Sequence, residues 1–194
     1  MTARTHDGFA FASLLTIATL YPPASLNLLT VGASIIGNII GALIPDMDQA
    51  GNRLWDLHPG GDSLGKIFRQ IFYKHRTITH SLLGVFLIYK GLNWLLPKFL
   101  NASFIDPQMI FISIMIGYLS HLLADAFTKE GLPLLFPIPI NFGLPPIAVL
   151  RITTDSWVET YIVQPGIGIY LIWFITTHQS QVLSLIQLIR QLPT

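Results

Sequence analysis

The chain has 194 residues, of which 52% are hydrophobic and only 11% are charged, with a net charge of +1. Soluble domains carry about 25% charged residues, so this composition excludes a free cytosolic domain and a disordered or collagen-like chain. The small net charge gives no reason to expect a nucleic-acid partner. Because the sequence contains no cysteine, any bound metal must be held by nitrogen and oxygen atoms. We therefore expect a single membrane-embedded domain over residues 1–194, folded as an all-α polytopic helix bundle.

Apolar stretches approach the roughly 20 residues that a membrane-spanning helix needs. We expect Pro97 to end the third of them and Pro165 to kink the fifth. Within the second, Gly32, Gly37 and Gly41 favour close contact with another helix. In chain order the five stretches are Gly8–Tyr21, Asn27–Pro45, His80–Leu96, Met109–Thr128 and Trp157–Thr177.

Other segments are not expected to span the membrane. Leu64–His75 has apolar residues along one stripe, which predicts a helix lying in the membrane interface. Gly131–Leu150 contains five prolines, so we expect a re-entrant or interfacial loop there. Gln181–Leu192 is typical of a short amphipathic helix. With the five stretches as spans, eight Lys and Arg residues fall on the side of the N-terminus and three on the other, which predicts a cytoplasmic N-terminus and an uncleaved signal anchor.

Candidate ligands gather at the cytoplasmic end of this predicted bundle. Ionisable groups at membrane depth are costly unless they are paired or bound to a metal, so we expect a metal site at this end. His121 and Asp125 are four residues apart and share one helix face, which suits two ligands of one ion or of adjacent ions, or else a hydrogen-bonded pair. The full set is His6, Asp46, Asp48, His75, His80, His121, Asp125 and Glu159.

The pair Asp46 and Asp48, and also Glu159, can be explained without a metal. Asp46 and Asp48 follow Pro45 at the expected end of a helix, where carboxylates oppose the helix dipole and a cation would remove the conflict. Oxygen ligands suit hard or borderline cations, although a solvated loop is the alternative. Glu159 is either a ligand or an acidic residue in the first turn of a helix, where capping and the dipole favour it.

The segment around His75 and His80 combines ligands with a cation. Their spacing of five residues lets both face one site only if His75 lies in a loop and Thr77 or Thr79 caps the helix that carries His80. Arg76 can bind a phosphate or carboxylate through two parallel hydrogen bonds. It is nearly as well explained as one of the cations that set membrane topology.

Several motifs support a resemblance to a known family. They are GALIPDMD (residues 41–48), HRTITHSL (75–82) and GYLSHLLADAFT (117–128), together with PLLFP (133–137) and WVE (157–159). In this order they resemble the YdjM-like family of bacterial inner-membrane proteins, whose members are described as membrane-bound metal-dependent hydrolases. The resemblance implies a multi-pass protein of the inner (plasma) membrane with a metal-dependent hydrolytic site.

The order of the candidate ligands is also similar, more faintly, to that of zinc-dependent phospholipase C and its nuclease relatives. That likeness implies zinc, with manganese as the alternative. Residues 126–158 contain no histidine, whereas those enzymes have two further histidine ligands there, so one or two ions are expected rather than three. The matching positions are His6, Asp46 or Asp48, His80, His121, Asp125 and Glu159.

Together these observations predict hydrolysis of a phosphoester in a lipid or lipid-linked substrate. Asp46 or Asp48 would act as the base on the attacking water, and Arg76 would bind a phosphate oxygen. Membrane lipids would enter past the proline-rich loop and the interfacial helix. A metal-ion transporter and a structural membrane protein whose metal joins helix ends are the alternatives.

Overall fold

The computed structural model describes residues 1–47 and 78–190, and within these residues the chain forms six α-helices and no strand. Two isolated backbone bridges pair Thr128 with Ile152 and Leu132 with Phe142. The α-helices are α1 (Ala3–Leu20), α2 (Leu28–Leu43), α5 (Leu82–Phe99), α6 (Pro107–Ala126), α7 (Gln164–Thr177) and α8 (Gln179–Arg190). Shorter elements are the 3-10 turns η1 (Ile78–His80) and η2 (Ala148–Leu150) and the π-helical η3 (Glu159–Val163).

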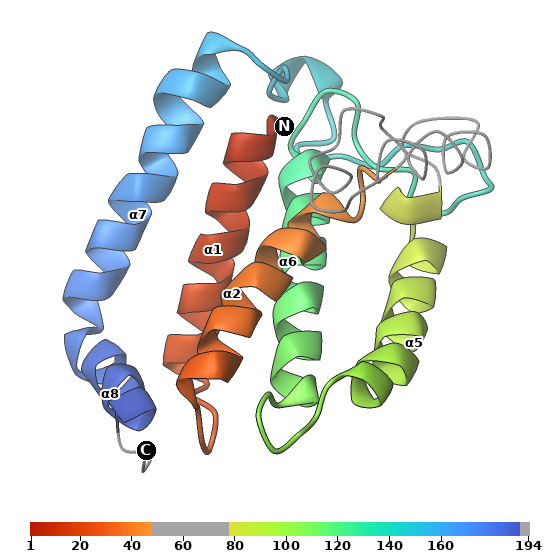
Figure 1. Cartoon of the computed structure of the whole chain (residues 1–194). Helices are drawn as coiled ribbons and strands as arrows, with labels where there is room; N and C mark the ends of the chain where they lie inside the picture. The colour runs from red at the N-terminus through yellow and green to blue at the C-terminus, as the bar shows by residue number, and fades with distance from the viewer. Residues whose placement is uncertain (48–77, 191–194) are drawn as a thin grey trace.

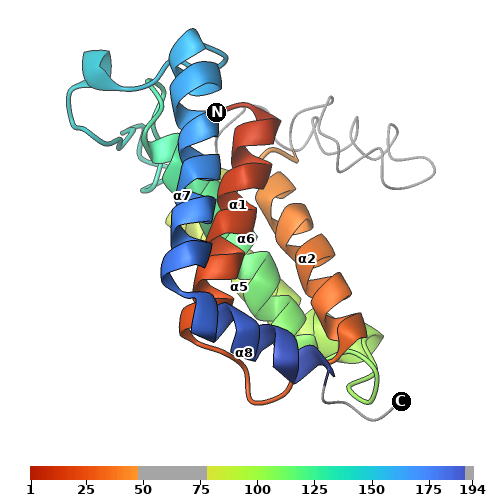
Figure 2. The same ribbon diagram turned by 90° about the vertical axis from the view of Figure 1, so that its left-hand side faces the viewer.

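Helix α6 forms the centre of the bundle, with α1, α2 and α5 around it (Figure 1). The described helices up to α7 alternate in direction along the chain, so α1, α5 and α7 begin at the end of the molecule where α2 and α6 finish. In the turned view α8 lies across the opposite end (Figure 2). Burial follows this arrangement. In an apolar stretch of 18 residues, 72% of the residues are buried in α6, but only 6% are buried in the segment formed by η3 and α7.

Polar side chains define where these helices begin. Asn27 accepts a hydrogen bond from Thr30 N (2.6 Å), and Asp106 accepts one from Gln108 N (2.8 Å) just before a proline at the first helical position. Ser81, which accepts from Gly84 N at 3.2 Å, caps α5. The expectation that Thr79 caps a helix carrying His80 is therefore wrong, because His80 lies in the 3-10 turn before α5.

Two further boundaries differ from expectation. Helix α1 begins at Ala3, which places His6 inside the helix rather than ahead of it. Helix α5 continues through Pro97 to Phe99, and Leu100 N still bonds to Leu96 O (2.9 Å) beyond the proline. A proline so near the end of a helix interrupts little of its hydrogen bonding. In the fifth segment the expected irregularity is the π-helical turn η3, directly before Pro165.

The contact between α2 and α6 is close enough to require glycine. A Cβ atom at Gly41 would lie 2.1 Å from the carbonyl oxygen of Ile114, and one at Gly117 would lie 2.0 Å from that of Asn38. The Asn38 side chain donates to Ser113 O at 3.1 Å and joins the same two helices. The expected role of Gly41 in helix contact is thus confirmed.

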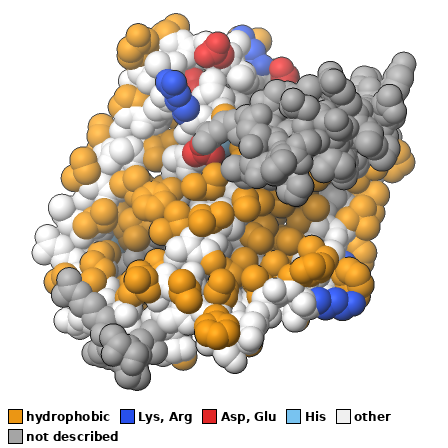
Figure 3. All heavy atoms as spheres, viewed as in Figure 1, with side chains coloured by type: hydrophobic (Ala, Val, Ile, Leu, Met, Phe, Trp, Pro, Cys, Tyr) orange, Lys and Arg blue, Asp and Glu red, His pale blue; other side chains and the backbone are white. Residues whose placement is uncertain are grey.

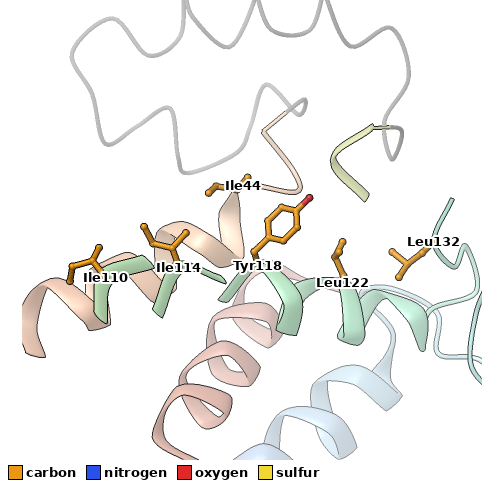
Figure 4. Packing of buried hydrophobic residues seen from close by; sticks show 6 residues of the cluster. All are labelled: Ile44, Ile110, Ile114, Tyr118, Leu122 and Leu132. Atoms are coloured by element: carbon orange, nitrogen blue, oxygen red, sulfur yellow. The ribbon is translucent and has the colours of Figure 1, made fainter. Parts of the chain in front are cut away.

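The apolar core runs along α6 (Figure 4). Its buried members are Ile44, Ile110, Ile114, Tyr118, Leu122 and Leu132. Leu132 belongs to the proline-rich loop, so this loop packs on the end of the bundle. The loop is tied there by bonds from Leu82 N to Leu134 O (3.0 Å) and from Leu144 N to Ala126 O (2.7 Å). Apart from the short η2, its expected lack of helix is confirmed.

The flank of the bundle is apolar. Hydrophobic side chains cover most of the face seen in Figure 3, and the acidic side chains in that view lie toward the end that holds the N-terminus. Within residues 1–47 and 78–190, two helical segments are long and apolar enough to cross a membrane: Pro107–Ala126 and Glu159–Thr177. Leu28–Leu43 is apolar but shorter. The expectation of about five spans therefore stays a prediction beyond these two.

Candidate metal centre

Five of the expected ligands converge at the end of the bundle where α1 and α5 begin and α2 and α6 finish (Figure 1). They come from four parts of the chain. His6 lies on α1, Asp46 in the turn after α2, His80 in η1, and His121 and Asp125 on α6. Their ligand atoms form two overlapping groups within which all atoms lie within 4.8 Å of one another.

Four of these side chains surround one point. His80 Nε2 lies 3.4 Å from Asp46 Oδ1 and 3.7 Å from Asp125 Oδ2. His121 Nε2 lies 3.7 Å from each of the same two oxygens. Two ligands bound at 2.0–2.1 Å to a tetrahedral zinc ion are about 3.3–3.4 Å apart. These four distances are therefore within a few tenths of an ångström of the spacing between two ligands of a tetrahedral ion.

Asp125 faces two groups at once. While Oδ2 points to His80 and His121, Oδ1 lies 3.3 Å from His6 Nε2 and 2.6 Å from the backbone nitrogen of Met1. The rings of His6 and His121 stack with centroids 3.7 Å apart and planes at 7°. A carboxylate with histidines on both oxygens can bind one ion or bridge two, so the geometry fits the expected number of one or two ions.

The second nitrogen of His121 is held by the backbone. Its Nδ1 lies 2.7 Å from the carbonyl oxygen of Ala42 on α2, and because a carbonyl only accepts, Nδ1 carries the hydrogen. In the neutral ring, the form that binds metals, Nε2 then carries the free lone pair. Among the described residues, Nε2 of His121 and both ring nitrogens of His6 have no hydrogen-bond partner although they are buried. Buried polar atoms without partners are unusual, and a metal ion would satisfy Nε2 of His121 and one ring nitrogen of His6.

The site is deeply buried except at Asp46. His6, His80, His121 and Asp125 are at most 2% exposed, whereas the Asp46 side chain is 25% exposed. Burial raises the pKa of the Asp46 carboxyl, but its contacts with His80 and His121 outweigh this and hold the pKa below its usual value. Asp46 is therefore an ionised carboxylate at neutral pH, the form in which it binds metals.

Glu159 lies outside both groups of ligand atoms. It is fully buried, and its Oε1 accepts hydrogen bonds from Thr2 N (2.6 Å), Thr2 Oγ1 (2.9 Å) and Thr5 Oγ1 (2.6 Å). Its Oε2 accepts from Asp155 N (2.8 Å). The carboxylate thus satisfies donors at the start of α1, where helical N–H groups lack partners, one turn from His6.

Tyr118 is a contributor that the sequence analysis missed. Its buried hydroxyl donates to the carbonyl oxygen of Thr79 and so anchors the turn that carries His80. It lies three residues before His121, on the same face of α6. That spacing is the signal in the sequence that could have identified it.

Some predictions fall on residues outside the described ranges. These are the candidate ligands Asp48 and His75, the candidate phosphate-binding residue Arg76, the capping candidate Thr77 and the interfacial helix Leu64–His75.

Comparison with known proteins identifies a family that matches nearly the whole chain, and relatives that match parts of it. The profile of the family described as YdjM inner membrane protein matches residues 1–188. The uncharacterized protein YvsG of Bacillus subtilis is 33% identical over 159 residues, which cover 82% of this chain and 85% of that protein. The inner membrane protein YdjM of Escherichia coli is 35% identical over 112 residues, which are 55% of this chain and half of that protein. No solved structure matches the chain.

Proposed function

Because this chain belongs to the YdjM inner membrane protein family, we propose that it is a membrane-bound, metal-dependent hydrolase. Its substrate is a phosphoester in a lipid or lipid-linked molecule, and its site lies at the cytoplasmic face of the inner membrane. The ion is zinc, with manganese as the alternative.

One observation carries this proposal: the convergence of three histidine nitrogens and two carboxylates from four parts of the chain, at separations of 3.3–3.7 Å. Nitrogen and oxygen ligands in this proportion suit zinc and manganese. The carbonyl of Ala42 behind His121 is the kind of outer contact that orients metal-binding histidines. The set is also larger than a hydrogen-bonded His–Asp pair would need.

A bound divalent cation would polarise a phosphoryl oxygen and lower the pKa of a water molecule to about 7. The residues of the chain would supply the rest of the chemistry. His80, His121 and Asp125 would fix the position of the ion, while Asp46, at the exposed side of the cluster, would accept the proton of the attacking water. The proposal assigns Arg76 to a phosphate oxygen and leaves Asp48 as a second candidate base.

A structural ion is the second candidate function. It is favoured by the burial of four of the five side chains, all at most 2% exposed. A structural site fills every coordination position with protein atoms, whereas a catalytic site leaves one open. Among the five side chains only Asp46 is partly exposed, so an open coordination position would have to lie on the side of the cluster where Asp46 is.

The first test is the metal content of protein purified in detergent without chelators, measured by elemental mass spectrometry. We expect one or two zinc or manganese ions per chain, and loss of the ion in His80→Ala and His121→Ala. His178→Ala is the matched control, because His178 lies beyond the end of α7, where its ring contacts Thr177 and Phe174 rather than the ligands of the cluster. Folded wild-type protein that contains no metal and takes up neither ion would overturn the proposal.

The second test separates a catalytic ion from a structural one. Metal-loaded wild type is incubated with a phospholipid phosphoester and with a soluble aryl phosphodiester, and Asp46→Asn is compared with it. We expect turnover by wild type and a large loss in Asp46→Asn with metal retained. Bound metal that stabilises the fold but supports no turnover of either compound would establish the structural role instead.

A further inference from the structure

A long apolar groove lies between α1 and the segment formed by η3 and α7, outside the metal centre. It encloses about 540 Å³. Its walls are made by Phe9, Ala12 and Ile17 of α1 and by Val163, Ile167 and Tyr170 of the other segment. The two helices lie side by side in both views (Figures 1 and 2).

The few polar atoms in this groove already have partners. Thr16 Oγ1 lies 2.7 Å from the Tyr170 hydroxyl and 2.7 Å from Ala12 O, and Ser13 Oγ donates to Phe9 O at 2.8 Å. An occupant therefore needs to supply no hydrogen bond. Water, which needs two to four polar partners in a buried position, is a poor occupant of such a space.

The surroundings of the groove are those of a lipid-facing surface. Only 6% of the apolar window of η3 and α7 is buried, and Ile169 and Ile172 next to the groove are 67% and 68% exposed. In a protein of the inner membrane these residues face the hydrocarbon of the bilayer. The groove lies beside this surface, so the acyl chains of the bilayer lipids would lie next to its opening.

We propose that the groove is a binding site for one acyl chain of a membrane phospholipid. The headgroup of this lipid lies at the end of the bundle that carries the metal centre, because the groove starts at Phe9 and Val163, within about one turn of His6 and Glu159. The lower end is closed by the Thr16–Tyr170 contact. This site concerns lipid binding and does not depend on the chain being a hydrolase.

Two glycines on α7 allow a matched test. Gly166 lines the groove, whereas Gly168 does not, and two residues along a helix point in nearly opposite directions. A Cβ atom at either position meets no atom within 4 Å. Gly166→Leu therefore fills the groove, while Gly168→Leu adds the same side chain to the lipid-facing side.

The probe is a phosphatidylethanolamine with a photoactivatable diazirine in one acyl chain, diluted into vesicles of unlabelled lipid that contain the full-length protein. Cross-linked peptides are identified by mass spectrometry. We expect enrichment on residues 9–17 and 163–170, a fall of about tenfold at these residues in Gly166→Leu, and wild-type labelling in Gly168→Leu. The metal content of both variants should equal that of wild type.

Labelling spread evenly over the exposed residues of α7 and unchanged in Gly166→Leu would overturn the proposal and leave only ordinary contact with the bilayer. Labelling of the exposed residues of α7 without labelling of residues 9–17 would do so as well, because the acyl chain would then not reach the groove. Neither result bears on hydrolysis. Conversely, the absence of turnover in a metal-loaded protein would leave the lipid site intact.

Discussion

Glu159 is buried like the histidines of the cluster, but its oxygens face hydrogen-bond donors rather than other ligands. The three bonds to Thr2 and Thr5 join the start of η3 to the first turn of α1. His6 follows Thr5 directly, so the position of its ring depends on how this turn is held. The contacts indicate that Glu159 orients the site through α1.

Replacing Glu159 with alanine should lower stability while leaving most of the bound metal. The change removes the oxygens that accept from Thr2, from the buried Thr5 and from Asp155 N, which costs about 3 kcal/mol in total. Glu159→Gln keeps an accepting oxygen and should lose less. Thermal unfolding followed by circular dichroism in detergent, with metal content measured on the same samples, checks this. If Glu159→Gln folds normally but loses its metal as completely as His121→Ala, Glu159 is a ligand, as the sequence predicts.

His6 occupies a different place in the cluster from the other histidines. A ligand atom of His6 groups with those of Asp46 and His121, whereas His80, His121 and Asp125 form a second group that does not include His6. We therefore expect His6→Ala to retain one ion per chain and to lose a second ion if wild type holds two. The metal-to-protein ratio of the two purified proteins measures this directly. Complete loss of metal in His6→Ala would mean that all five side chains serve one ion.

At the scale of helices, the crossing of α2 and α6 determines whether the site can form. The carbonyl of Ala42 that orients His121 lies beside Gly41, where the two backbones are in contact. Any change that separates these helices moves Ala42 away from His121. Metal binding and helix packing are therefore coupled at this crossing.

Gly41→Ala should destabilise the protein and weaken metal binding together. The new Cβ would lie 2.1 Å from Ile114 O, and backbone must shift to relieve the overlap, at a cost of about 1–3 kcal/mol or more. Gly32→Ala on the same helix is the control, because its Cβ meets nothing within 4 Å. Melting temperature and zinc affinity by competition with a chelating dye are measured for both. Equal behaviour of the two variants would show that the crossing tolerates a wider separation.

Sequence patterns predicted most of the helices because each is an apolar run bounded by proline or a capping residue. They also predicted the pairing of His121 with Asp125, which depends only on helical periodicity. They failed where the outcome depends on distant contacts. The start of α1 is polar in sequence and becomes helical where Glu159, far along the chain, satisfies its donors. Likewise, Ser81 and Thr79 are both residue types that cap helices. The hydrogen bond from Tyr118 to Thr79 O holds Thr79 in the turn before α5 and leaves Ser81 as the cap.

For the whole molecule, the alternating helix directions have a consequence for topology. The turn at residues 101–106 lies between α5 and α6 at one end of the bundle, whereas the loop at residues 127–158 lies at the end with the metal centre (Figure 1). If the helices cross the membrane, these two connections must lie on opposite sides of it. The excess of Lys and Arg predicts that the second connection lies in the cytoplasm.

The absence of cysteine allows this to be tested with single substitutions. Ser103→Cys and Thr154→Cys each add a thiol at an exposed position, one in each connection. In intact cells a membrane-impermeant maleimide should label Ser103→Cys readily, and Thr154→Cys only after the membrane is permeabilised. The reverse pattern, with Thr154→Cys labelled in intact cells and Ser103→Cys only after permeabilisation, would place the metal centre on the periplasmic side, and labelling of both in intact cells would show that α6 does not cross the membrane. Because the proposed substrate headgroup must reach Asp46, the side on which Thr154→Cys reacts also determines which leaflet supplies that substrate.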